Sequence, residues 1–313
     1  MMSLRKLLVK TMDKSIIKDI KKLNIKVDEN VELEKITSYK AGGKARVIAY
    51  PNHLNELVDL LKLLKINNIK WKIIGNCTNL LFSDELYDGV LIKLKDFDKV
   101  EFLSQSRVRV GAGFSLIKLS SMCAKRDLTG LEFASGIPGS IGGAVYMNAG
   151  AYKSDMGYIV KNVKVLTDEF EVITLTNLEL DFHYRDSFLK RHPGYICLEA
   201  LIQLKKGKKE AILEVMNDRR KRRIDSQPLE YPSCGSVFRN PEGESAWKYI
   251  EEAGLKGKRI GGAMVSEKHA NFIINYDHAT ATDIHELIML VHDTVLEKFN
   301  IDLKCEQEFV NWE

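Results

Sequence analysis

Two glycine-rich stretches of the chain have the composition of loops that bind an anion through the backbone. Five of the residues from Ser135 to Tyr152 are glycine, and most of the others are small or apolar. About sixty residues earlier, an apolar run leads into a segment, 73–84, that offers glycine and small polar residues. Successive N–H groups in such turns form an anion-binding nest that needs no cationic side chain. Together, the two stretches predict a site for a pyrophosphate.

Each stretch alone is explained slightly better as a tight turn between closely packed elements. The presence of two such loops, with Pro138 fixing φ in the longer one, favours the ligand. The sequence has no G-x-x-x-x-G-K-[ST] motif, and the GAGFSL segment has Leu116 where a dinucleotide fingerprint needs its third glycine. The loops therefore differ from the usual nucleotide-binding motifs.

Composition and cysteine spacing narrow the class of protein. The 313 residues are 45% hydrophobic and 29% charged, with a net charge of +4, so a soluble globular protein of two or three domains is expected. Such a small net charge does not indicate a nucleic-acid partner. Five scattered cysteines without a C-x-x-C pair argue against a zinc site and favour a cytoplasmic location. The absence of a long apolar run predicts no membrane contact, and no metal ligand set is recognisable.

Hydrophobic periodicity predicts the elements that must position these loops. Strands are expected at 44–51, 71–75, 89–94, 99–103, 107–113, 160–167, 170–176, 194–204, 269–275 and 305–312. Helices are expected at 52–64, with Asn52 as its cap, and at 115–126, 207–223, 246–255 and 282–299. The first 23 residues place apolar side chains at helical spacing, namely Leu4, Leu7, Leu8, Ile16, Ile20 and Leu23.

The order of these elements predicts an α+β protein of several parts. Strands and a helix alternate before residue 96, close strands suggest a largely antiparallel sheet up to 206, and a charged helix follows. We expect an N-terminal helical segment at 1–29, two subdomains at 30–95 and 96–206, and a last domain at 207–313.

Three motifs occur in the order found in a flavoenzyme family. TSYKAGG (37–43), GNCTNLLFSD (75–84) and GLEFASGIPGSIGGAVYMNAGAY (130–152) resemble the FAD-binding half of UDP-N-acetylenolpyruvoylglucosamine reductases, the MurB family. The resemblance runs from about residue 30 to the C-terminus. It implies a two-part FAD-binding module of the vanillyl-alcohol oxidase/PCMH type, followed by an α+β substrate-binding domain.

The resemblance also implies the cofactors and the residues that hold them. FAD is the expected cofactor and NADPH the expected co-substrate. The expected FAD-binding residues are Gly75, Asn76, Thr78, Asn79, Leu80, Gly136, Pro138, Gly139, Ser140, Ile141, Gly142, Gly143, Ala144 and Asn148. One position departs from the family, because Cys77 stands at the second glycine of the first loop. If φ must be positive there, cysteine costs about 1–2 kcal/mol.

The family reaction passes hydride from reduced FAD to the enolpyruvyl double bond of UDP-N-acetylglucosamine enolpyruvate, giving UDP-N-acetylmuramate. The resemblance places Arg185, in FHYRDSF, on the substrate carboxylate, a planar group that suits a guanidinium fork. Tyr184 is an expected substrate contact beside it. From the residues alone, Arg185 would instead form an ion pair with Asp181 or Asp186.

The resemblance assigns the proton donor to Ser236 in YPSCGSVFRNP. Without it, Ser236 is a turn serine after a glycine, and Cys234 is by its chemistry the better acid. About fifty residues separate Arg185 from Ser236, as in the shorter family type that lacks an inserted substrate-covering loop.

The catalytic glutamate of the family corresponds to Glu306 in LKCEQEF. The family usually has an apolar and a basic residue next, whereas this chain has Gln307 and Glu308. Strand alternation predicts that Glu306 and Glu308 share one face, so Glu308 is the alternative. A solvated carboxylate pair on an edge strand is the structural alternative.

Weaker correspondences concern the substrate. Arg223 matches an arginine that contacts substrate, while the rest of the RRKRR run reads as a solvated helix face. Asn240 and His269 are further expected substrate contacts, although a lone histidine is more often structural.

Two other functions stay open from the sequence. One is a sugar or alcohol oxidase on the same fold, although segment 75–80 lacks the flavin-linking histidine of many such enzymes. The other is a non-catalytic flavin- or nucleotide-binding relative, which Cys77 and the altered residues after Glu306 would suit. The sequence does not determine the oligomeric state.

Overall fold

The first unit is a four-stranded sheet with a helix on one face. In this computed structural model, which describes residues 14–312, the strand order is β1 (Lys26–Glu32), β2 (Lys44–Tyr50), β5 (Tyr87–Lys93) and β3 (Trp71–Ile74). β1 pairs antiparallel to β2, whereas β2, β5 and β3 are parallel. The helix α2 (Leu54–Ile66) buries Leu57, Leu60, Leu61 and Leu64 against this sheet, because side chains at this spacing share one helix face.

The start of α2 differs from the prediction. The N-cap is His53, whose Nδ1 accepts a hydrogen bond from the Glu56 amide at 3.4 Å. Asn52 lies one residue earlier, and its own amide donates to the Glu56 carboxylate at 2.7 Å. The turn is therefore closed from both sides, and the capping prediction was wrong by one residue.

The N-terminal helical prediction lies partly outside the described residues. Leu4, Leu7 and Leu8 fall there, whereas α1 (Lys14–Lys22) buries Ile16 and Ile20 in the core of the first unit. A 3-10 turn, η1 (Leu33–Lys35), follows β1.

The second unit is a five-stranded antiparallel sheet, as predicted. The order is β12 (Val172–Thr176), β11 (Val160–Leu166), β13 (Ile196–Gln203), β7 (Arg107–Gly111) and β6 (Val100–Phe102). Short elements cover it and connect it to the rest: α3 (Leu116–Ala124), β8 (Leu128–Thr129), η2 (Glu132–Gly136), α4 (Ile141–Tyr146), β9 (Gly150–Ala151), β10 (Ser154–Asp155), η3 (Met156–Tyr158), α5 (Asn177–Leu180), α6 (Phe188–Arg191) and β14 (Lys205–Lys206). Residues of α3, η2 and α4 share one core with alternate residues of the strands.

The C-terminal unit packs two helices on a three-stranded antiparallel sheet. The helices are α8 (Ala246–Glu252) and α9 (Ala281–Phe299), and the strands are β15 (Arg259–Ile260), β16 (Ala263–Val265) and β17 (Ile273–Asn275). The predicted apolar face of α9 is confirmed, since Ile284, Leu287, Ile288, Val291 and Val295 are buried. A capping box between Thr280 and Asp283 starts this helix.

The last strand is shorter than predicted and belongs to another unit. β18 (Glu308–Val310) pairs in parallel with β4 (Leu80–Phe82), which follows the first glycine loop. Cys305 makes only an isolated bridge to Phe238. Glu306 therefore precedes the strand, so strand alternation does not place it, although Glu306 and Glu308 both line one cavity.

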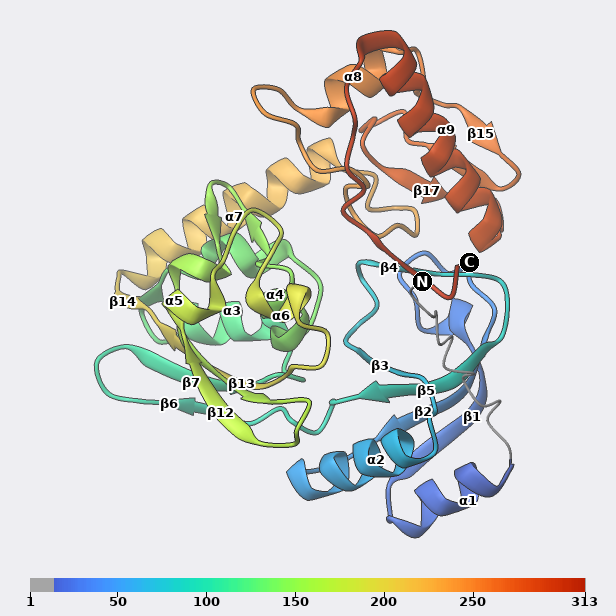
Figure 1. Cartoon of the computed structure of the whole chain (residues 1–313). Coiled ribbons are helices and arrows are strands. Elements are labelled where there is room, and N and C mark those ends of the chain that lie inside the picture. Colours follow the sequence, from blue (N-terminus) through green and yellow to red (C-terminus); the bar gives the residue numbers. More distant parts are fainter. Residues whose placement is uncertain (1–13, 313) are drawn as a thin grey trace, which may run out of the picture.

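Helix α7 (Lys209–Ser226) joins the second unit to the third. It runs along the second unit in Figure 1 and packs on η2 and α3. The predicted domain boundaries at 30, 96 and 207 stay a proposal. The strand bounds would move the first boundary to the start of β1 at Lys26. The contacts of α7 with the second unit would move the last boundary to the end of α7.

The predicted α+β class is confirmed, and residues from all three units line one cavity. Between residues 14 and 312, the helices are all too short or too polar to traverse a lipid bilayer.

A buried tyrosine ties the loop after η1 to the C-terminal segment. Tyr39 is fully buried among C-terminal core residues, and its hydroxyl donates to Gln307 Oε1 at 2.8 Å. The Asn275 amide donates to the carbonyl of Tyr39 at 2.9 Å, which fixes the same loop to β17. Three segments far apart in the sequence are thereby joined.

We expect Tyr39→Phe to lower the free energy of unfolding by about 1–3 kcal/mol, because Gln307 Oε1 is then buried without a donor. The double variant Tyr39→Phe/Gln307→Leu should regain most of this loss, since neither polar partner is left. Urea unfolding of the two single variants and the double variant measures the coupling. Simply additive losses would contradict the role assigned to this hydrogen bond.

Candidate functional site

One large cavity lies where the three units meet. Its volume is about 1070 Å³, above the usual range for drug-sized ligands, so it can hold an extended ligand and a second molecule. Most of the residues predicted from sequence line it: Gly75, Asn76, Thr78, Asn79, Leu80, Pro138, Gly139, Ser140, Gly142, Gly143, Ala144, Arg185, Arg223, Ser236 and Glu306.

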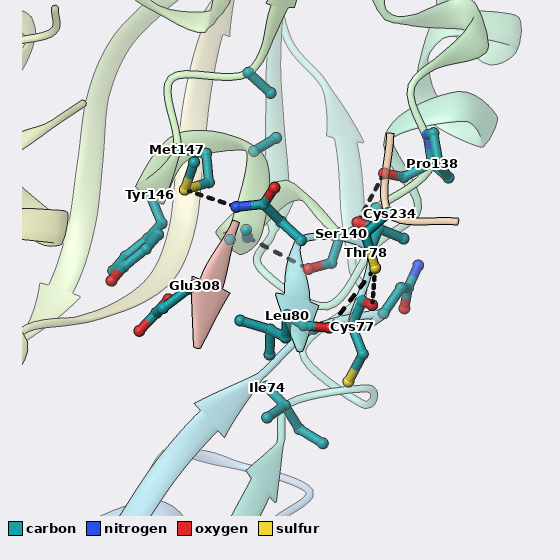
Figure 2. A pocket seen from close by; sticks show the side chains of 18 of the residues that line it. Ile74, Cys77, Thr78, Leu80, Pro138, Ser140, Tyr146, Met147, Cys234 and Glu308 are labelled. Carbon is teal, nitrogen blue, oxygen red and sulfur yellow. Dashed lines mark hydrogen bonds between the residues drawn. The ribbon is translucent and has the colours of Figure 1, made fainter. Parts of the chain in front are cut away.

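The two glycine loops meet in space. The Thr78 hydroxyl donates to the carbonyl of Pro138 at 3.2 Å, a contact drawn in Figure 2. A Cβ atom on Gly75 would lie 2.6 Å from Ser140 Oγ, so a side chain at Gly75 would push against the second loop. Gly139 has φ of +151°, a conformation that side-chain-bearing residues rarely adopt. The glycines therefore permit close approach of two backbones around one space.

Three predicted cofactor residues lie behind this lining. Ile141 is fully buried in the core of the second unit. The Asn148 amide donates to the His183 carbonyl at 2.8 Å, and its Oδ1 accepts from the Gly157 amide at 2.9 Å. Gly136 faces Arg223, whose Cδ would lie 3.1 Å from a Cβ there. All three shape the second loop from behind.

Cys77 is in the left-handed conformation that glycine favours, with φ of +52°. Its side chain is buried, and its carbonyl accepts the Ser38 amide at 3.4 Å. Burial raises the pKa of the Cys77 thiol to about 11, against the opposing attraction of the Lys93 and Lys72 ammonium groups. The strain that the sequence suggested is therefore present, and the thiol is protonated at neutral pH.

Arg185 and Glu306 form a largely buried ion pair, although 121 residues separate them. Arg185 Nε donates to Glu306 Oε1 at 2.8 Å, and its Nη2 donates to the Gly150 carbonyl at 2.9 Å. The alternative partners Asp181 and Asp186 instead bind Arg191. Two of the five N–H donors of Arg185 are thus engaged, which leaves three for a ligand.

Glu308 has a different set of neighbours from Glu306. Its carboxylate pairs with Lys72 of β3, and it lies beside Tyr146 of α4 in Figure 2. Burial raises the pKa of the Tyr146 hydroxyl, and the Glu308 carboxylate raises it further. Glu308, in the C-terminal segment, therefore contacts both the first and the second unit, which the sequence did not reveal.

A half-buried lysine lies close to both carboxylates. Lys190 Nζ donates to the Arg185 carbonyl at 3.3 Å. Burial and the Arg239 guanidinium lower the pKa of Lys190, whereas Asp186, Glu308 and Glu306 oppose this shift. Lys190 thus lies within a group of cations and carboxylates next to the cavity.

The loop that carries Ser236 is held by its neighbours. Asn271 Oδ1 accepts the Phe238 amide at 2.9 Å, and Asn271 Nδ2 donates to the Phe238 carbonyl at 2.8 Å. The Glu306 amide donates to the Val237 carbonyl at 2.7 Å. These bonds place the backbone of Glu306 next to that of Ser236. Asn271 was missed, although it lies in the HANF motif that singled out His269.

Cys234, the alternative acid in this loop, is poorly placed to donate a proton to a ligand. It is 6% exposed, and its thiol points to the carbonyls of Leu80 and Cys77. Burial raises its pKa. By contrast, the Ser236 hydroxyl lines the cavity and makes no hydrogen bond with residues 14–312.

Two further predicted residues lie near the cavity. The Arg223 guanidinium lies over Gly136 without an ion pair to any described residue, and burial lowers its pKa. Tyr184 is half exposed and outside the cavity lining, with its ring 5.2 Å from the Arg185 guanidinium carbon.

Asn240 and His269 are not brought to the cavity wall. Asn240 Oδ1 accepts the Ala246 amide at 3.1 Å at the start of α8. His269 Nδ1 accepts the Asn271 amide at 3.2 Å, and burial lowers its pKa, which suits a neutral acceptor ring. Both have a structural role, and their substrate contacts stay predictions.

A metal site finds no support in the described part of the chain, where no three His, Cys, Asp or Glu side chains are grouped as ligands. The five cysteines are free thiols.

Two family models match this chain. One, described as an FAD binding domain, matches residues 45–176 and so covers both glycine loops. The other, described as the C-terminal domain of UDP-N-acetylenolpyruvoylglucosamine reductase, matches residues 227–310. The predicted FAD-binding module and its distinct C-terminal domain are thereby confirmed.

Whole-chain comparisons agree. The UDP-N-acetylenolpyruvoylglucosamine reductase of Bacillus licheniformis is 43% identical over 301 residues, covering 96% of this chain and 99% of that protein. A reductase of the same name from Bacillus subtilis is 43% identical over 298 residues, covering 94% and 98%. The crystal structure of the Thermus caldophilus enzyme aligns with a TM-score of 0.78 at 34% identity, covering 91% of this chain and 99% of that one. This chain belongs to the UDP-N-acetylenolpyruvoylglucosamine reductase family.

Proposed function

We propose that this protein reduces the enolpyruvyl group of UDP-N-acetylglucosamine enolpyruvate to give UDP-N-acetylmuramate, a peptidoglycan precursor, with FAD as cofactor and NADPH as reductant. The observation that carries the proposal is one cavity lined by both glycine loops and by Arg185, Ser236 and Glu306. Arg185 and Glu306 in this lining form an ion pair at 2.8 Å.

The residues of the cavity fit FAD. At Gly75 the absence of a Cβ leaves space next to Ser140. At Gly139 the backbone conformation is one that other residues rarely adopt. Backbone N–H groups of both loops can then face a diphosphate. We assign this role to the predicted set, with Ile141, Gly136 and Asn148 supporting the second loop from behind.

The chemistry that FAD supplies when bound is hydride transfer, from NADPH to the substrate double bond. The free donors of Arg185 suit the substrate carboxylate, whose negative charge grows as the double bond is reduced. Glu306 holds Nε of this guanidinium, so the fork keeps one orientation. Fixed donors of this kind stabilise the transition state more than the ground state.

Ser236 is the proposed donor of the final proton. Its hydroxyl faces the cavity, and its neighbour Val237 is bonded to the Glu306 backbone. A serine is a weak acid, so this proposal requires the nearby charges to assist proton transfer. Arg185, which binds Glu306, and Lys190, which both carboxylates influence, are cations of this network.

Arg223 is the proposed contact for the substrate diphosphate. Arg223 lines the cavity without an ion pair to any residue from 14 to 312, and guanidinium binds phosphate oxygens well. Tyr184, Asn240 and His269 are weaker proposals, because none of them lines the cavity.

The half-reaction tests the proposal. Flavin-loaded protein is reduced anaerobically with NADPH, and the enolpyruvyl substrate is then added while flavin absorbance is followed. Rapid return of the oxidised spectrum is expected. A flavin that reduces and then stays bleached would instead support an oxidase or a non-catalytic relative.

Gly75→Ala tests the flavin cradle. The new methyl group meets Ser140 Oγ, so FAD affinity should fall at least about tenfold. Adding Ser140→Ala removes the clashing oxygen and should restore most of the affinity relative to Ser140→Ala alone. Fluorescence titration of the flavin-stripped full chain measures both effects. Equal losses with and without Ser140→Ala would contradict this contact.

Ser236→Ala should leave flavin binding intact and slow substrate-dependent flavin reoxidation by about 10²–10⁴-fold, the usual contribution of a general acid. Ser233→Ala, in the same loop, is the matched control. Stopped-flow absorbance under anaerobic conditions gives the rates. An unchanged rate in Ser236→Ala would overturn the serine assignment.

Glu306→Gln and Glu308→Gln separate the two carboxylates. Loss of charge at Glu306 weakens its hold on Arg185, so reoxidation should slow by about a hundredfold. Glu308→Gln breaks the pair with Lys72 and should mainly lower the unfolding midpoint. The same stopped-flow assay, with thermal unfolding alongside, decides between them. The opposite ranking of rates would assign the catalytic role to Glu308.

A further inference from the structure

Five cations line the cavity, and most of them have partners. Arg185 binds Glu306, and Lys72 binds Glu308. Lys95 lies over the Tyr50 ring at 5.1 Å and 3.9 Å from Asp96. Arg223 is the proposed diphosphate contact of the substrate. The remaining cation, Lys93, makes no ion pair or hydrogen bond with the residues that the structure describes.

The register of the first sheet places Lys93 at the base of the first glycine loop. It is the last residue of β5, and its Cα pairs with that of Ile74 on the neighbouring parallel strand. Ile74 directly precedes Gly75, where the loop begins. Ligands of open parallel sheets bind beyond the carboxyl ends of the strands, which is where Lys93 lies.

The Lys93 side chain is on the loop side of the sheet. Its neighbour Ile92 packs in the core with the leucines of α2, whereas Leu91 packs with Ile74 and Cys77 on the other face. Strand alternation puts Lys93 on the face of Leu91. Its ammonium also lowers the pKa of the Cys77 thiol more than that of Lys72 does, against the larger effect of burial.

The charge balance of the loop explains why a free cation here has a role. Segment 75–80 contains no lysine or arginine, so its own contribution to an anion is limited to N–H groups and small polar side chains. Glu308 neutralises Lys72, the other lysine on this face. Lys93 therefore supplies the uncompensated positive charge beside the loop.

We propose that Lys93 is a cofactor-binding residue whose ammonium pairs with the diphosphate of FAD at the first glycine loop. The inference rests on the FAD binding assigned above and adds a contact that the loop motif does not contain. A lysine acts here as a point charge on a mobile stem, which suits phosphate oxygens. This contact would also offset the loss of FAD affinity expected from the strained conformation of Cys77 in this loop.

Titration of the flavin-stripped full chain with FAD and with riboflavin tests this role. Lys93→Gln should weaken FAD binding about ten- to hundredfold, the effect of losing one charge-assisted contact. Riboflavin lacks the phosphates, so its affinity should not change. The FAD affinity of Lys93→Gln should also depend less on salt than that of the unmodified protein. Lys93→Arg should retain most of the affinity.

Lys95→Gln is the matched control. It removes the same charge two residues further along the chain, from a lysine whose ammonium already contacts Tyr50 and Asp96. It should bind FAD like the unmodified protein. Thermal unfolding and circular dichroism of each variant check the fold, and Lys93→Arg tests the charge if Lys93→Gln does not fold.

Several outcomes would overturn the proposal. These are unchanged FAD affinity in Lys93→Gln, an equal loss of riboflavin affinity, or a rise in the KM for NADPH with FAD binding intact. Failure of the unmodified chain to bind FAD would instead refute the assigned cofactor, so the two failures are distinguishable.

Discussion

The short stretch of backbone between Glu306 and Val310 is the constraint on which the site depends. Its strand β18 pairs in parallel with β4, the strand that directly follows the first glycine loop. Asn79 makes the junction, because its amide donates to the Glu306 carbonyl at 3.1 Å while its own carbonyl accepts the Glu308 amide at 3.0 Å. The first glycine loop and the backbone of Glu306, the proposed catalytic glutamate, are thereby held together.

Charge pairing makes this junction specific. Two carboxylates lie two residues apart in the sequence, yet each binds its own cation from a different unit of the fold, Arg185 for Glu306 and Lys72 for Glu308. Removing one partner of a buried pair leaves an uncompensated charge, which is strongly destabilising. A slip of one residue in the register of β18 would turn Glu308 to the other face of the strand and away from Lys72, so this pair also favours the register.

Some of the residues with strained backbone lie at or near the same cavity. Cys77, Arg185 and Tyr152 all have positive φ although none is glycine. Each such residue costs of order 1–3 kcal/mol and persists when its surroundings determine its conformation. The Arg185 carbonyl binds both Lys190 and Arg239, and the Tyr152 hydroxyl binds the Arg219 carbonyl of α7. The strain is therefore held by contacts from neighbouring elements at the site.

The sequence by itself determined the glycine loops, the antiparallel second sheet and the apolar face of α9, because these depend on local periodicity and on residue types that tolerate unusual φ angles. It also indicated the family, because three motifs occur in the order that the family has. Tertiary structure alone decided which charges meet. Spacing along the chain cannot show that Arg185 binds Glu306 rather than its neighbour Asp186, nor that Glu308 turns to Lys72. The same holds for Lys93, whose place beside Gly75 follows from strand pairing across a sheet. Electrostatic energy depends on distance in space, and only the packed fold sets that distance.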